Sequence, residues 1–209
     1  MSEASMAEGG RPTIKLLLKW LAITVGLSVL TLVVVGLFLP RTWEVDRRVE
    51  ITASRAQIHA LVGDLERWPE WMFDPDQDEL GMTVTAEGAG VGATVRWQGG
   101  GSTGQMTLVE SDPTTGVRWE GKIETDEVNN HGEIRYEAGE DEGVVVVILH
   151  DTGELPPVLG GYFVPVMNAG LGQHFQAALE RLEGAVEGVG EGVGEGVGEG
   201  APEQAGEAP

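Results

Sequence analysis

Apolar and polar residues alternate in the segment that begins at Thr42. The apolar positions are Trp43, Val45, Val49 and Ile51, and the polar positions among them are Glu44, Asp46, Arg48 and Glu50. A period of two is typical of a β-strand with one face buried and the other in water. The pattern therefore predicts a half-buried strand at the start of a folded domain.

Helical spacing follows this strand. Ser54 is suited to the N-cap, and the apolar residues after it are Ile58, Leu61, Val62 and Leu65. Pro69 disfavours a helical residue before it, so we expect one helix to end at Trp68 and a short second helix to begin there. Trp68 and Trp71 would then point to one side, where they either fill the core or form the mouth of a pocket.

The remainder of the domain reads as strands and then a long helix. Short alternating stretches follow Asp78, and "SDPTTG" and "GEDEG" have the composition of turns, which predicts an antiparallel meander of about six strands. Helical spacing returns at Leu171, Phe175, Ala178, Leu179 and Leu182. The expected order is a strand, two short helices, about six strands and a long helix, which is an α+β domain.

Twenty residues without a formal charge, from Trp20 to Leu39, precede the domain. As a helix they would be about 30 Å long, which matches the hydrocarbon thickness of a bilayer. A cleaved signal peptide or a buried core helix is disfavoured by this length and by the lack of a small-residue cleavage site. We expect a membrane anchor over residues 16–40, with Lys19 reaching outward and with Trp20 and Trp43 at the two membrane interfaces.

The charge of the chain is strongly negative, with a formal net value of −21. Residues 41–182 contain ten basic and twenty-five acidic side chains, which argues against nucleic acid as a partner. The chain contains no cysteine, which excludes disulfides, thiolate zinc sites and a cysteine nucleophile. Basic residues flank the anchor on both sides, but those before it directly adjoin the apolar run. We therefore expect residues 1–15 in the cytoplasm and the domain on the non-cytoplasmic side.

From Glu187 the sequence repeats Gly, Val, Gly and Glu before it continues into Pro and Ala. Half of the repeat is glycine and every period carries a charge, so this segment cannot offset the entropy of ordering. We expect residues 187–209 to form a disordered acidic tail. It is either an acidic spacer or interaction tail, or a solvated remnant of repeat expansion, and composition favours the remnant.

The domain over residues 41–186 resembles the SRPBCC or START-like superfamily, in particular the polyketide cyclase/dehydrase and lipid transport group. The motifs that carry the resemblance are "ALVGDLERWPEWM", "GVGATVRWQG", "GQMTLVESDPTTGVRWE" and "TGELPPVLGGYF". The resemblance implies a helix-grip fold, in which a curved antiparallel sheet of about six to seven strands wraps the long last helix. It also implies an apolar cavity between them, with Trp68 and Trp71 on short helices that close the open end of the sheet.

Such a cavity suits an apolar small molecule or lipid, because apolar walls with a few polar groups bind and orient such ligands. The candidate ligand-binding residues are Trp71, Met72, Trp97, Met106, Trp119, Tyr136, Tyr162, Phe163 and Met167. Aromatic and methionine side chains are suited to an adaptable pocket, although for any single one of them an ordinary core position is the more frequent case. This composition favours a membrane-tethered binding module.

Catalysis has weaker support in the sequence. The four histidines show no metal-binding spacing, "EAGEDEG" lacks the pattern of a calcium loop, and we expect neither a metal nor a cofactor. His150 is the candidate acid or base, but neighbouring strand residues face opposite ways, so Asp151 should not act with it. A cyclase- or hydratase-like enzyme that uses polar cavity residues such as His150 and Tyr136 is the alternative function.

The composition of the tail makes a direct prediction. Removal of all residues after Val186 should leave the free energy of unfolding within about 0.5 kcal/mol of the full chain, because a charged glycine repeat buries nothing. Denaturant unfolding of the two chains measures the difference. A larger loss on truncation would mean that the tail packs against the domain.

Overall fold

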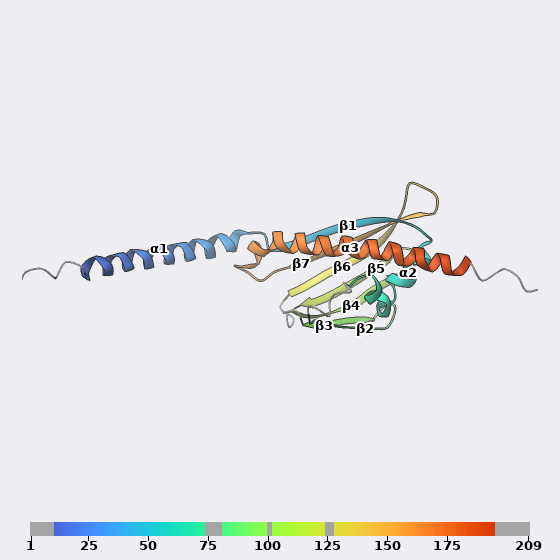
Figure 1. Cartoon of the computed structure of the whole chain (residues 1–209), viewed down its shortest axis with the longest axis horizontal. Coiled ribbons are helices and arrows are strands. Elements are labelled where there is room, and N and C mark those ends of the chain that lie inside the picture. Colours follow the sequence, from blue (N-terminus) through green and yellow to red (C-terminus); the bar gives the residue numbers. More distant parts are fainter. Residues whose placement is uncertain (1–10, 74–80, 100–101, 124–127, 195–209) are drawn as a thin grey trace, which may run out of the picture.

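The computed structural model describes residues 11–73, 81–99, 102–123 and 128–194, and they form helices and a single sheet (Figure 1). The helices are α1 (Arg11–Phe38), α2 (Arg55–Val62), the 3-10 helix η1 (Leu65–Glu70) and α3 (Gly160–Gly194). The strands are β1 (Thr42–Thr52), β2 (Thr83–Glu87), β3 (Thr94–Gly99), β4 (Ser102–Asp112), β5 (Gly116–Ile123), β6 (Val128–Ala138) and β7 (Val144–Glu154).

All seven strands belong to one antiparallel sheet in the order β1-β7-β6-β5-β4-β3-β2. Consecutive strands from β2 to β7 are neighbours, and β1 pairs with β7 to form one edge. The curved sheet lies beside the long helix α3, and α2 and η1 lie at the end away from α1 (Figure 1). This is the helix-grip α+β fold that the sequence predicts.

The inner face of the sheet and one side of α3 share the hydrophobic core. Alternate residues of each strand enter it, including Ile51, Leu108, Ile134 and Val147. The residues that α3 contributes are Phe175, Ala178, Leu179, Leu182 and Val186, which recur at helical spacing. The later part of α3 therefore closes the sheet, as its sequence pattern indicates.

The helix pair after β1 differs in detail from the prediction. Ser54 caps α2 through a complete capping box with Gln57, as the N-cap prediction requires. However, α2 ends at Val62 instead of continuing to Trp68, and Pro69 lies inside η1 instead of separating two helices. The predicted boundary is wrong because Gly63 ends α2 and Asp64 then caps a new 3-10 turn.

Trp68 and Trp71 do lie together at this end of the sheet. Both indoles are buried, with ring centroids 5.4 Å apart, and Trp68 Nε1 donates to the carbonyl oxygen of Val62. Trp68 also packs edge-on against Trp119 of β5. Of the two roles considered for this pair, the structure shows that they fill the core.

Helix α1 projects away from the domain (Figure 1). Its segment Ile14–Phe38 is long and apolar enough to cross a membrane, and 6% of its most apolar window is buried. No residue of α1 belongs to the hydrophobic core of the domain. The interfacial position expected for Trp43 is wrong, because this indole is fully buried on the inner face of the sheet.

The last helix is longer than the sequence suggests. Repeat residues from Glu187 to Gly194 continue α3, although the expected tail begins at Glu187. Extension of an existing helix needs no new nucleation, which explains how a glycine-rich repeat prolongs one. The rest of the predicted tail, residues 195–209, lies outside the described residues, as do residues 1–10 of the predicted cytoplasmic segment.

The separate core of the domain generates a prediction. A shortened chain of residues 41–194 should be soluble and should unfold cooperatively, because its core contains no contribution from α1. Circular dichroism and denaturant unfolding of this chain provide the test. An unfolded or aggregated product would show that the domain depends on α1.

Candidate functional site

Three tryptophans on the inner face of the sheet each lie over a glycine of the neighbouring strand. The register pairs are Trp43 with Gly153, Trp97 with Gly104, and Trp119 with Gly132. A side-chain carbon added to any of these glycines would overlap the indole opposite. Glycine inside a strand often marks close approach by another group. Here it allows large rings to lie flat on a curved sheet.

A buried polar cluster lies on the same face, at the end of the sheet nearest α1. One carboxylate oxygen of Asp151 accepts a hydrogen bond from Trp43 Nε1 at 2.9 Å, and the other accepts one from Asn130 Nδ2 at 3.0 Å. Asp151 is only 3% exposed. Since the amide nitrogen of Asn130 faces Asp151, its Oδ1 turns toward Gly121, where it has no hydrogen-bond partner among the described residues.

Burial changes the acidity of this carboxyl group. Loss of water raises the pKa of Asp151 to about 6, although hydrogen bonds from Trp43 and Asn130 and the nearby His150 and His131 favour the ionised form. Asp151 can therefore change its charge near neutral pH. A group of this kind can either donate or accept a hydrogen bond, according to its protonation.

A second polar chain lies at the opposite end of the sheet. His59 Nδ1 is 3.2 Å from the hydroxyl of Tyr136, and His59 Nε2 is 3.2 Å from Ser111 Oγ. Partial burial lowers the pKa of His59, although Asp112 opposes this change, and burial raises the pKa of Tyr136. A neutral imidazole donates at one nitrogen and accepts at the other, so it can link the two hydroxyl groups.

His150 and Asp151 face opposite sides of β7, as the strand period predicts. His150 lies on the outer face, where its Nδ1 is 2.9 Å from Asp46 Oδ1. Glu44 completes a group whose potential ligand atoms lie within 4.8 Å of one another, and both carboxylates are exposed. Asp151 instead faces inward, where it joins Trp43 and Asn130, and its role there was not predicted from the sequence.

The predicted ligand-binding residues occupy three different environments. The hydrophobic core contains Trp71, Met72, Met106, Trp119 and Tyr136. Trp97 of β3 is half-buried and packs against that core. Tyr162, Phe163 and Met167 lie on the first turns of α3, where the first two are exposed and the third is half-buried. The structure therefore brings the first six to the inner face and leaves the last three at the α1 end.

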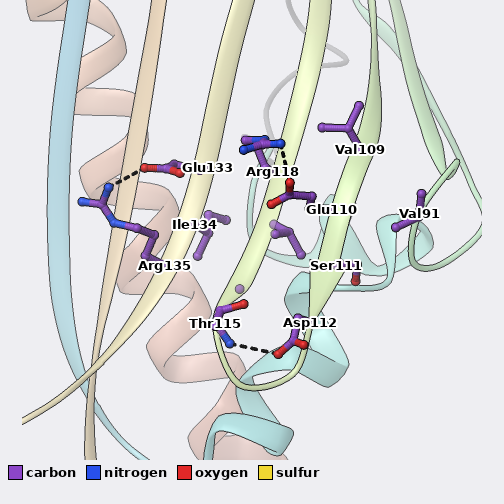
Figure 2. A pocket seen from close by; sticks show the side chains of 12 residues that line it. Val91, Val109, Glu110, Ser111, Asp112, Thr115, Arg118, Glu133, Ile134 and Arg135 are labelled. Atoms are coloured by element: carbon purple, nitrogen blue, oxygen red, sulfur yellow. Dashed lines mark hydrogen bonds and ion pairs between the residues drawn. The ribbon is translucent and has the colours of Figure 1, made fainter.

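The hollows described on this structure lie on the outer face of the sheet. One of about 520 Å³ is lined partly by charged residues of β4, β5 and β6, with ion pairs between Arg118 and Glu110 and between Arg135 and Glu133 (Figure 2). Two further hollows, of about 670 and 750 Å³, are also lined mostly by polar and charged residues, and Trp97 adds an apolar wall to the larger one. None of these three linings is typical of a site for an apolar molecule.

A curved antiparallel sheet that grips a long carboxy-terminal helix defines the helix-grip, or START-like, class of proteins. Residues 42–187 match the family described as "Polyketide cyclase / dehydrase and lipid transport". The match covers more than half of the chain and almost the whole domain. The chain belongs to this family.

Solved structures share the fold at low sequence identity. Protein CV1439 from Chromobacterium violaceum is 16% identical, with a TM-score of 0.50 over 71% of this chain and 99% of that one. A norcoclaurine synthase point mutant from Thalictrum, solved with a transition-state analogue, is 13% identical, with a TM-score of 0.53 over 71% and 96%. Comparison with curated protein sequences finds no match. At these identities the structural likeness establishes the fold alone.

The buried carboxyl group generates a pH prediction. Asp151 has a pKa of about 6 when folded and about 3.8 when unfolded, so the folded state holds the proton more tightly. The contribution of Asp151 to stability should therefore fall as the pH rises from 4 to 7, by about 3 kcal/mol. In Asp151→Asn this loss should disappear.

Denaturant unfolding of the wild type and of Asp151→Asn across this pH range gives the two free energies of unfolding. Subtracting one from the other removes the contributions of all other titratable groups. The control is Asp141→Asn, which changes an exposed carboxylate in the β6–β7 turn. This variant should lose as much stability between pH 4 and 7 as the wild type does. If the difference in unfolding free energy between the wild type and Asp151→Asn did not change with pH, the raised pKa of Asp151 would be contradicted.

Proposed function

We propose that this protein is a membrane-tethered binding module that holds an apolar small molecule or lipid between the inner face of the sheet and α3. The buried pair of Asp151 and Asn130 carries the proposal. In this arrangement the pair orients a polar group of the ligand, such as a hydroxyl, and the apolar remainder lies along the flat indoles. The family description is consistent with such a ligand.

An orphaned polar atom in a buried position supports a binding role. An amide oxygen without a partner costs about 1 to 3 kcal/mol when it is buried, and most such atoms in folded proteins have a partner. Asn130 Oδ1 lacks one among the described residues, and Asp151 next to it is held in an environment that disfavours its charge. A ligand hydroxyl that donates to Asn130 Oδ1 would remove this cost.

The first half of α3 supports access to the same end of the sheet. No residue of α3 between Gly161 and Gly172 is buried, whereas five residues after Gly172 enter the core. Val164, Met167 and Leu171 recur at helical spacing and are half-buried. This part of α3 follows the edge strand β1, where Asn168 Oδ1 accepts from the backbone of Glu44 and Arg47 donates to the carbonyl oxygen of Gly172. A small movement of this half of α3 would open the inner face without disturbing the core.

The membrane part of the proposal rests on α1. Its Ile14–Phe38 segment is about 37 Å long, which is more than the thickness of the hydrocarbon layer, and its apolar side chains are exposed. An exposed apolar surface of this length needs an apolar environment. With α1 in a bilayer, the polar cluster lies at the membrane-proximal end of the sheet.

A binding measurement on the shortened chain of residues 41–194 tests the proposal. The probe is a fluorescent sterol with a free hydroxyl, and the matched probe is the same sterol with this hydroxyl methylated. Asn130→Leu should weaken binding of the hydroxyl sterol by about tenfold, or 1.4 kcal/mol, since it removes the acceptor. It should change binding of the methylated sterol little.

His150→Ala is the matched control, because His150 adjoins Asp151 in the sequence but faces the outer side. This variant should bind both probes as the wild type does, and circular dichroism checks the fold of each variant. If the wild type bound neither this sterol nor a fluorescent fatty acid, the proposed function would be wrong. Equal losses for both sterols in Asn130→Leu would refute the role of the amide.

The alternative function is a cyclase- or hydratase-like reaction. The observation that favours it is the chain of Tyr136, His59 and Ser111, which joins two hydroxyl groups through an imidazole. The pair of His150 and Tyr136 considered from sequence is not formed, because His150 contacts Asp46 on the outer face. Turnover of a bound substrate that is lost in Tyr136→Phe, with binding retained, would favour the enzyme.

A further inference from the structure

Exposed apolar side chains gather next to the end of α1. Outside α1, the large hydrophobic residues that are exposed in the described part of the chain are Val91, Leu159, Tyr162, Phe163 and Val166. The last four lie within eight residues, in the turn before α3 and in its first two turns. We call these four residues the α3 patch. An apolar group of this kind on a domain surface is typical of an interaction site.

The α3 patch is fixed against α1. The hydroxyl of Tyr162 donates to the carbonyl oxygen of Leu32 at 2.8 Å. A side-chain carbon on Gly36 would overlap the carbonyl oxygen of Val158, and one on Gly161 would overlap Leu39, so glycine on each side permits the contact. Val158 adopts a φ of 72°, which is uncommon for a β-branched residue.

The depth of the α3 patch follows from this contact. Leu32 precedes the end of α1 by six residues, or about 9 Å of helix. The hydroxyl of Tyr162 therefore reaches a part of α1 that belongs to its apolar span. Gly161 lies at the level of Leu39, and Val166 lies one turn further along α3, away from α1. The start of α3 lies next to the end of α1, and α3 then runs away from α1 along the sheet (Figure 1). With α1 in a bilayer, the α3 patch lies at the boundary of the hydrocarbon layer.

The orientation and charge of the helix fit this position. At 3.6 residues per turn, Tyr162 and Val166 lie on the side of α3 opposite the core residues Phe175 and Leu182. The first twenty residues of α3, from Gly160 to Leu179, contain no Asp, Glu, Lys or Arg. In a chain with a net charge of −21, this is a stretch that anionic lipid headgroups would not repel.

We propose that the α3 patch is a second membrane contact, which inserts into the leaflet at the carboxy-terminal end of α1. The occupant of this surface is the lipid bilayer, because the patch is continuous with the apolar surface of α1. This inference rests on the tethering part of the proposed function. Its consequence is that the domain is held in one orientation, with the Asp151 end of the sheet facing the lipid surface.

Aromatic residues suit this contact. Tyrosine prefers the membrane interface, where its ring is in an apolar layer and its hydroxyl reaches a polar partner. The ring of Tyr162 lies beside Gly36, and its hydroxyl keeps a hydrogen-bond partner in the carbonyl oxygen of Leu32 on α1. The ion pair of Arg41 and Glu154 lies just beyond the end of α1, at 2.5 Å, where the headgroups would begin.

Single-cysteine labelling of the full chain tests the inference, because the natural sequence contains no cysteine. Val166→Cys and Phe163→Cys carry an environment-sensitive nitrobenzoxadiazole label, and the protein is reconstituted in phosphatidylcholine vesicles with lipids spin-labelled at a shallow or deep position. The matched control is Val91→Cys. Val91 is 67% exposed and Val166 68% exposed, and Val91 lies in the domain away from α1. Leu27→Cys reports on the anchor itself.

The inference predicts a blue-shifted emission at positions 163 and 166, with loss of fluorescence in vesicles that contain the shallow spin label. The label at position 27 should be quenched most by the deep spin label, and the label at position 91 by neither. If the label at position 27 were quenched while the labels at positions 163 and 166 were quenched no more than the label at position 91, the α3 patch would not be a membrane contact. The membrane anchor would still be supported. Without quenching at position 27, both proposals would be refuted.

Discussion

The inner face of this sheet depends on one steric constraint, which is that an indole can lie flat only where the neighbouring strand has no side chain. Trp43, Trp97 and Trp119 meet this condition through Gly153, Gly104 and Gly132. A β-branched residue at any of these glycines would push the ring away from the sheet and into the space beneath α3. The same constraint places Trp43 Nε1 within hydrogen-bond distance of Asp151, so the geometry of the polar cluster follows from it.

The polar cluster and the core divide the inner face into two parts. The part away from α1 is filled by Trp68, Trp71 and the later residues of α3. The part near α1 holds a carboxyl group with a raised pKa and an amide oxygen without a partner among the described residues. The half of α3 nearest α1 contributes no fully buried side chain to the core. Under the proposed function, stability and binding would be separated along one sheet, with the packed end holding the fold and the polar end contacting the ligand.

Local patterns were sufficient to predict the order of the elements, and the family resemblance supplied their helix-grip arrangement. The alternation in β1, the cap at Ser54 and the helical spacing from Leu171 are signals contained within a few residues, and the structure confirms each of them. The site was less accessible to prediction, because it depends on register. The run "VVVVILHD" in β7 gives no alternation from which to assign faces, and Asp151 meets Asn130 and Trp43 only through pairing across 21 and 108 positions. For the same reason Trp43 was assigned to a membrane interface, although its partner is a buried carboxylate.

The central claim is that the polar end of the inner face binds one apolar molecule through a polar group. Native mass spectrometry of the shortened chain, mixed with a total lipid extract, tests this claim most directly. The account predicts a single adduct per chain, strongly reduced in Asn130→Leu and unchanged in His150→Ala. If only the bare chain were detected, or if both variants retained the adduct, the account would be contradicted.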